Sequence, residues 1–451
     1  MKFKFLNQNM EQRRELILNG NVVSTILLLS IPALMMGVVQ SLIPVIDGLF
    51  LNNLAGSVAA SAVTYSSPIV NMTSALSQGL SVAGMAIIGQ SNGRGDFQGS
   101  KRITTQLVIF AFLLGFILAP LLVVLAFPIS NHVDKEIAHS VFLYLSLNAI
   151  VIPFSFLESI YNAIKNASGK PEDAFTRMIL MLVLKVIFNF VFVALLPWGI
   201  VGSVMASLAS NIIITVWMFN ELFFKKGGDN LDLKGFRFEK ETIKQLFHIG
   251  FPSMLSSLML NLGFFLINNE VEKYGTAVLT GQGIANNITS VCFILPSSFG
   301  SAVTTMVSMN IGALQGKRAK KACFVGCIIS AITAVILIAV VVPLSSRLTV
   351  LFTREADILE IAKRALHIYT YSVVGFGICM VIQGAFIGLG RTRITLVLSI
   401  LRVWLLRYIF ILLTESHLGY LSVFWGNLFS NYMAAMITII LIIRVKWKSE
   451  L

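Results

Sequence analysis

The chain has 451 residues, of which 56% are hydrophobic and 12% are charged, and its net charge is +13. Soluble domains usually carry about 25% charged residues, and a soluble protein of this length has too little interior to hide so much apolar surface. No charged residue lies between Glu15 and Asp47 or between Asp47 and Arg94. Each stretch exceeds the roughly 20 apolar residues that cross a bilayer. The composition excludes a soluble protein and predicts a polytopic membrane protein.

The apolar runs, bounded by Gly, Pro, Asn and charged residues, predict twelve membrane spans. In the first half of the chain they cover residues 22–50, 58–86, 104–129, 138–165, 174–196 and 199–223. In the second half they cover residues 245–271, 277–308, 322–345, 362–387, 393–414 and 419–443. We therefore expect an N-terminal lobe over 1–223, a charged cytoplasmic linker over 224–244 and a C-terminal lobe over 245–451.

The basic residues gather in alternate loops, which is the pattern that sets the orientation of membrane proteins. Clusters lie near residues 2–14, 94–102, 170–177, 225–244, 317–321, 391–393 and 444–448, and the intervening loops are poor in Lys and Arg. Both termini are expected on the cytoplasmic side of the bacterial inner membrane. The excess positive charge then suits contact with anionic lipid, and no nucleic-acid partner is expected.

The two halves of the chain repeat each other at a nearly constant offset of 219–221 residues. The matching pairs are Pro32 with Pro252, Gly93 with Gly312, Asn162 with Gln383, and Gly169 with Gly390. Each half holds six predicted spans, an even number, so the halves run parallel about an axis along the membrane normal. Alternating-access transporters use this symmetry and bind their substrates where the repeats meet.

Four sequence segments carry a family resemblance through their order, spacing and duplication. They are Pro44–Asp47, the glycine-rich segment Gly89–Asp96, its counterpart Asn310–Ala313, and Gln383–Thr392. With these, the chain resembles the multidrug and toxic compound extrusion (MATE) family over essentially its whole length, in particular the bacterial branch that includes DNA-damage-inducible protein F. The resemblance implies an all-α fold of two six-helix lobes around a central cavity, and export driven by entry of H⁺ or Na⁺.

A charged side chain at the middle of a membrane span costs roughly 2.5–3.5 kcal/mol on insertion scales, so it is a functional candidate. Five remain once loops and span ends are set aside: Asp47, Glu158, Lys185, Arg402 and Arg407. The resemblance implies a cation site formed by an acid on span one, an acid on span four, an Asn-x-x-x-Asp pair on span five and a small hydroxyl residue on span six. Asp47, Glu158 and Ser207 fit this pattern, whereas Lys185 and Asn189 replace the Asn and the Asp of span five.

Lys185 places an ammonium group where the family holds an exchangeable cation. If Asp47, Glu158 and Lys185 form one cluster, its net charge is −1 and one further positive charge neutralises it. A proton is the expected occupant, because burial and like charge favour the neutral form of a carboxyl group. We therefore expect proton coupling, shared by Asp47 and Glu158, with Na⁺ as the alternative. Two other interpretations make Lys185 part of a structural ion pair or a ligand for an anionic substrate.

Other polar or bending residues within the spans complete the candidate site. Candidates for the wall of a substrate cavity are Gln40, Asn71, Gln78, Tyr161, Asn162, Asn261, Gln282, Asn286, Gln383 and Arg402. Bonding between helices is the alternative for many of these residues. Arg402 and Arg407 are five residues apart and are therefore expected on different faces of span eleven, where Arg402 contacts substrate or lipid, or satisfies carbonyls of a kinked helix. Pro32, Pro44 and Pro252 are expected to break or bend spans one and seven.

Other classes of function are less well supported by the sequence. No phosphate-binding loop is present, and the five His show no metal-ligand spacing, so no catalytic residue, metal or cofactor is expected. We expect a monomer that exports small organic, amphipathic or cationic compounds. The alternative is a flippase for lipid-linked precursors, or an exporter of a specialised metabolite, in the same superfamily.

Overall fold

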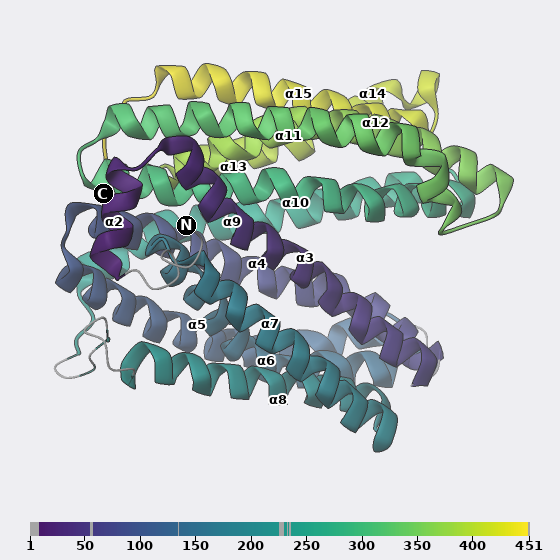
Figure 1. Ribbon diagram of the computed structural model, residues 1–451. Helices are drawn as coiled ribbons and strands as arrows, with labels where there is room; N and C mark the ends of the chain where they lie inside the picture. The colour runs from purple at the N-terminus through teal and green to yellow at the C-terminus, as the bar shows by residue number, and fades with distance from the viewer. Residues whose placement is uncertain are drawn as a thin grey trace. The chain divides into compact units, whose positions relative to one another are not determined.

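Helices make up every element of the computed structural model, which describes residues 9–54, 57–133, 135–224, 230–231, 233 and 236–449. Within these ranges no strand occurs, and twelve helices are long and apolar enough to cross a membrane. The prediction of an all-α protein with twelve spans is confirmed (Figure 1). All the observed spans except the last are longer than predicted, because the helices continue through polar residues at their ends.

The chain divides into two compact units. Unit 1 contains Met1–Arg13 and Met35–Ser257, and unit 2 contains Arg14–Leu34 and Leu258–Leu451. The predicted lobes differ from these units at one place in each repeat. The division between the units falls within helix α3 (Val22–Leu54) and again within helix α9 (Lys240–Glu272). Both changes of unit follow a repeat proline, Pro32 or Pro252, by a few residues.

Unit 1 is built around a central helix. Its elements are α4 (Ser57–Arg94), α5 (Phe97–Asn131), α6 (Lys135–Ala167), α7 (Pro171–Asn189), the π-helix η1 (Phe190–Leu195), α8 (Gly199–Phe219) and the π-helix η2 (Asn220–Phe224). Helix α6 packs against α4, α5, α7 and α8. Polar side chains on α6 are therefore held inside the unit, where they must find partners among the neighbouring helices.

Unit 2 repeats this arrangement with α12 at its centre. Its elements are α10 (Thr276–Gly312), α11 (Gly316–Val350), α12 (Ala356–Gly388), α13 (Thr392–Ile400), the π-helix η3 (Leu401–Tyr408), α14 (Ile409–Leu418) and α15 (Leu421–Arg444). Helix α12 packs against α10, α11, α13 and α15. Because α12 corresponds to α6 in the repeat, the duplication seen in the sequence extends to the packing.

The backbone explains why one glycine recurs in both repeats. Gly169 and Gly390 follow the ends of α6 and α12 with φ values of 69° and 81°. A residue with a Cβ atom is disfavoured in this left-handed conformation, which closes many helix C-termini. The repeated glycine thus ends the central helix of each unit.

Two predicted interruptions of the helices are corrected by the structure. The helical assignment runs without a break through Pro32, Pro44 and Pro252, so none of these prolines ends a span, and their role in bending stays a prediction. The predicted linker over 224–244 is shorter, because α9 already begins at Lys240. Residues 225–229, 232, 234 and 235 of this segment, like the chain ends at 1–8 and 450–451, lie outside the described residues.

Candidate functional site

Helix α7 carries two buried basic residues of unit 1 on a single slanted row. Arg177, Met181, Lys185 and Asn189 are each four residues apart, and all four are buried. Side chains at this spacing are neighbours on one side of a helix. Arg177 and Lys185 are eight residues apart and are therefore separated by about 12 Å along the helix axis, with the apolar Met181 between them.

Asp47 of α3 contacts Lys185 and Asn189, the last two residues of this row. Its Oδ2 atom accepts a hydrogen bond from the Lys185 ammonium group, and its Oδ1 atom accepts one from the Asn189 amide at 2.8 Å. The side chains of Asp47 and Lys185 are 22% and 8% exposed. Both carboxylate oxygens thus have a fixed donor, and the ion pair lies in a largely desolvated place where its loss would be costly.

Glu158 of α6 has a different partner from the one predicted. Its Oε2 atom lies 3.1 Å from an Arg177 guanidinium nitrogen, and Lys185 is bonded to Asp47 instead. The predicted single cluster of net charge −1 is therefore wrong: two neutral pairs lie about two turns apart on α7. Sequence reasoning missed Arg177 because it lies near the start of the predicted span 174–196, in a cluster of basic residues, and was set aside as a span end. Its spacing of eight residues from Lys185 was the available signal.

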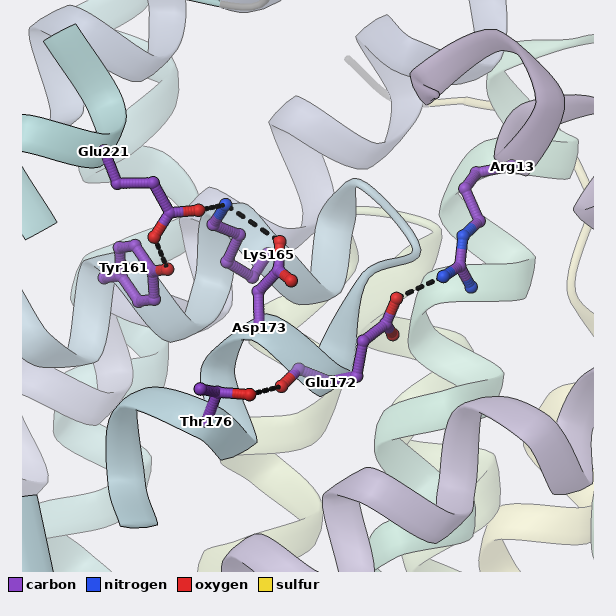
Figure 2. Close-up of polar contacts among 7 residues, drawn as sticks. All are labelled: Arg13, Tyr161, Lys165, Glu172, Asp173, Thr176 and Glu221. Atoms are coloured by element: carbon purple, nitrogen blue, oxygen red, sulfur yellow. Dashed lines mark hydrogen bonds and ion pairs between the residues drawn. The ribbon is translucent and has the colours of Figure 1, made fainter. Parts of the chain in front are cut away.

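A second polar network lies where α6 ends and α7 begins (Figure 2). Lys165 of α6 donates hydrogen bonds to Asp173 of α7, at 3.0 Å, and to Glu221 of η2. The Tyr161 hydroxyl donates to the other oxygen of Glu221. One ammonium group therefore links two carboxylates from different elements. This network was not predicted, because its members stand at span ends, where charge is ordinarily solvated.

Arg13 of helix α2 (Met10–Asn19) is bound to the same end of α7. It forms an ion pair with Glu172 and is only 1% exposed (Figure 2). Burial lowers the pKa of the Arg13 guanidinium, and the nearby Glu172 carboxylate opposes that shift. The pair fixes the chain before the first span to the start of α7.

A cavity of about 210 Å³ opens beside this network. It lies within unit 1, and its lining includes Lys101, Thr104, Lys165, Lys170, Asp173 and Glu221. Basic, acidic and hydroxyl side chains share its wall, so water is a suitable occupant.

We expect Lys165→Met to destabilise the protein by about 2 kcal/mol, because it leaves Asp173 and Glu221 without a shared charge-assisted donor. Thermal unfolding of the purified protein in detergent measures the effect. Lys165→Arg is the matched control, because it keeps the charge and the donors. Equal losses in both variants would contradict the assignment of the network to charge pairing.

The predicted cavity residues separate into two groups. Four of them, Gln40, Asn71, Gln78 and Asn286, are exposed on the surface of their own unit. Polar side chains at membrane depth are unfavourable against lipid, so they normally face water-filled space. The exposure of these four is consistent with the predicted role. Asn162 and Asn261 are partly buried.

The remaining predicted cavity residues are buried. Tyr161 is bonded to Glu221, and Gln383 donates to the Cys379 sulfur at 3.2 Å. Gln282 is 2% exposed and bonds to Tyr369. In this conformation Tyr161, Gln282 and Gln383 bind protein groups instead of facing a cavity, which corrects their predicted placement. Arg402 is also buried, at 6% exposure.

The hydroxyl group predicted to complete the cation site is hydrogen-bonded within its own helix. Ser207 donates to the carbonyl oxygen of Ser203 at 3.1 Å, within its own helix. Among the described residues, no group of three or more His, Cys, Asp or Glu side chains could hold a metal ion. The candidate site of unit 1 therefore reduces to Asp47, Lys185 and Asn189.

A family model matches the chain twice. The model, MatE, covers residues 32–191 and again residues 252–413, and the two starts are 220 residues apart. The chain belongs to the multidrug and toxic compound extrusion (MATE) family. The double match confirms the internal duplication, and membership makes the chain a multi-pass membrane protein of a multidrug efflux family.

Relatives match the chain over most of its length. The probable multidrug resistance protein YoeA of Bacillus subtilis is 24% identical over 390 residues, which are 83% of each chain. The multidrug export protein MepA of Staphylococcus aureus is 22% identical and covers 90% of each chain. A crystal structure of MATE in the straight conformation has a TM-score of 0.89 at 22% identity, covering 94% of this chain and 96% of that one. This last likeness shows the fold.

Proposed function

We propose that the protein is a proton-driven exporter that exchanges H⁺ for small amphipathic or cationic organic compounds. The observation that supports this most directly is the bonding of Asp47. Lys185 and Asn189 donate to its two carboxylate oxygens. A sodium ion would have to displace the tethered ammonium group from its strongest partner, whereas a proton needs only one oxygen atom. Lys185 thus occupies the place of a metal cation.

Protonation of Asp47 supplies the conformational drive. A proton removes the negative charge of Asp47 and leaves the Lys185 ammonium group buried without its counter-charge. Breaking one side of a buried pair in this way costs about 3–5 kcal/mol. A conformation that hydrates Lys185, or that separates the end of α3 from α7, relieves the cost. The proton thus favours one state of the transporter, and its loss favours the other.

Glu158 has a structural role in this proposal. Its pairing with Arg177 neutralises it about two turns from Asp47, so Asp47 alone carries the coupling proton. Substrate passes through a central cavity that opens alternately to each side. The exposed polar side chains Gln40, Gln78 and Asn286 are the proposed contacts with substrate.

The location proposed for the protein is the bacterial inner membrane, with both termini in the cytoplasm. The even number of spans and the basic residues of alternate loops support this orientation. The protein works as a monomer, because each chain already contains both repeats between which such transporters bind substrate.

Efflux of ethidium from proteoliposomes tests the coupling ion when pH and sodium gradients are imposed separately. We expect the pH gradient alone to drive efflux, and the sodium gradient at constant pH to give no more efflux than a choline gradient. Liposomes without protein measure the leak of the dye. Efflux driven by sodium at constant pH would overturn proton coupling, and the absence of efflux under either gradient would overturn the assignment of the dye as a substrate.

A further inference from the structure

Unit 2 contains two buried arginines on one side of the π-helix η3. Arg402 and Arg407 are 6% and 7% exposed. The sequence predicted different faces for them, because five residues of an α-helix turn well past one full circle. In a π-helix the backbone hydrogen bond joins residues i and i+5, so residues five apart lie nearly above one another. The π-helical segment Leu401–Tyr408 therefore corrects that prediction and brings the two guanidinium groups to the same side.

Neither arginine has an acidic partner among the described residues. The Arg402 guanidinium lies 3.5 Å from the amide oxygen of Asn431 and 5.2 Å from the centre of the Phe376 ring. The Arg407 guanidinium lies 5.9 Å from the Phe264 ring and interacts with the Tyr369 hydroxyl. The Nε atom of each is buried without a hydrogen-bond partner in the described part of the chain. Among the described residues, Arg402 forms no hydrogen bond with a main-chain carbonyl group, which the interpretation of a kinked helix would require; its hydrogen-bond partner is the Asn431 side chain.

Glu270, a largely buried acid of this unit, has other partners. Glu270 of α9 pairs with Lys273 and accepts a hydrogen bond from the Tyr408 hydroxyl at 3.3 Å. Its side chain is 9% exposed, so these two donors account for a largely buried carboxylate. Glu270 therefore does not neutralise Arg402 or Arg407.

Comparison of the two repeats shows why unit 2 has buried arginines without an acidic partner. The two family matches start 220 residues apart and end 222 residues apart, which places Lys185 opposite residues 405–407 and Asp47 opposite residue 267. Residue 267 is Ile267, 1% exposed in the core of unit 2. The second repeat thus keeps a buried base on its fifth span but has an apolar residue in place of the acid. Arg402 adds a second base.

Two buried cations without a counter-charge are expensive in a protein interior, and such groups are normally paired. We propose that Arg402 and Arg407 form a binding site within unit 2 for an oxyanion, the phosphate or carboxylate group of an amphipathic organic compound. Guanidinium groups fit these anions well, because their planar donors match two oxygen atoms at once. This site would let the transporter accept anionic or zwitterionic compounds in addition to cations.

The surroundings of the two arginines indicate whether the bound anion belongs to a lipid headgroup or to a transported compound. Arg402 and Arg407 lie 10 and 15 residues into the span Thr392–Leu418, hence about 15 and 22 Å along a helix of about 40 Å. This is the middle of the membrane, far from the phosphates of lipid headgroups. The rings of Phe376 and Phe293, with centres 4.4 Å apart, supply an apolar surface beside Arg402. Both features favour the anionic group of a transported compound.

An exposed aromatic side chain lies beside Arg407. Phe264, whose ring lies beside Arg407, is itself 42% exposed. Rotation of one exposed phenylalanine is a fast motion. A ligand can therefore reach the pair without unfolding of the unit, and its aromatic part can take the place of the Phe264 ring.

Binding of 1-naphthyl phosphate to the purified protein in phosphatidylcholine nanodiscs tests the site, without any ion gradient and hence independently of proton coupling. We expect the double variant Arg402→Gln/Arg407→Gln to bind this probe at least about tenfold more weakly, a loss of about 1.4 kcal/mol. The neutral 1-naphthol should bind both proteins equally. Arg364→Gln is the matched control, because it removes an exposed arginine of the same unit that is paired with Glu360. Equal binding of 1-naphthyl phosphate by the double variant and the wild type would overturn the proposal.

Thermal unfolding provides a second test, because a structural role of the two arginines predicts a different unfolding temperature for the double variant. Because the double variant loses two buried charges that have no counter-charge, its unfolding temperature without ligand should equal or exceed that of the wild type, and the probe should not raise it. A lower unfolding temperature would show that the polar contacts of the arginines within the protein outweigh the cost of burying their charges, and would overturn the proposal. Phosphatidylglycerol added to the nanodiscs should not displace the probe. Displacement would overturn the assignment to a soluble anion, in favour of a lipid phosphate.

Discussion

Efflux driven by a pH gradient should disappear in Asp47→Asn, while the folded protein persists. Asparagine keeps an oxygen atom that can accept one of the hydrogen bonds from Lys185 and Asn189, but it cannot take up or release a proton. We expect a loss of at least about 100-fold in the rate of pH-driven ethidium efflux, as for removal of an essential proton carrier. Exchange of labelled for unlabelled substrate across the membrane, which needs no net proton movement, should continue. Proteoliposomes with and without the gradient provide both measurements.

The control for this variant must separate coupling from stability, because Asp47→Asn leaves the buried Lys185 without its counter-charge. Asp47→Asn/Lys185→Met restores neutrality and should unfold close to the wild-type temperature, yet it should still lack pH-driven efflux. If the rate of pH-driven efflux by this double variant equals that of the wild type, the Asp47–Lys185 pair only stabilises the structure, and another residue carries the proton.

Much of the fold was predictable from the sequence, because lipid imposes a strong and simple requirement. A span must be apolar over about 20 residues, so the twelve spans follow from apolar runs alone. The repeat was equally visible, since Gly169 and Gly390 both stand where a left-handed backbone closes a helix. Asp47 and Lys185 could be selected as site residues because each is an isolated charge in an apolar run.

The partners of the charged residues could not be predicted in the same way. A pairing depends on helix rotation and on the neighbouring helix, and a nearly uniform apolar sequence has little periodicity to show which side faces inward. Arg177 was set aside as a residue at a span end, although it pairs with Glu158. The π-helix η3 was also invisible, and with it the fact that Arg402 and Arg407 share one side. The sequence predicted some of the buried charges, such as Lys185 and Arg402, but it missed Arg177 and the geometry of the pairs.

Removal of the Arg177 side chain should produce the largest loss of stability among these variants. Arg177 and Glu158 are 2% and 17% exposed, so Arg177→Met leaves a mostly buried carboxylate without its counter-charge. We expect the free energy of unfolding to fall by about 3–5 kcal/mol, the usual effect of breaking a buried pair from one side. Thermal and denaturant unfolding in detergent micelles measure the loss. Arg364→Gln, which breaks the exposed pair with Glu360, should change stability by less than about 1 kcal/mol.

The double variant Glu158→Gln/Arg177→Met tests whether the pair stabilises the protein through its charges and whether Glu158 takes part in coupling. With both charges removed, no uncompensated ion remains in the interior, so most of the lost stability should return. Failure to recover would show that Arg177 acts through packing and not through charge. If Asp47 alone carries the proton, this double variant should also retain pH-driven efflux. A stable double variant without efflux would assign Glu158 a share of the coupling, because a pair that only holds two helices together can be replaced by uncharged side chains without stopping the pump.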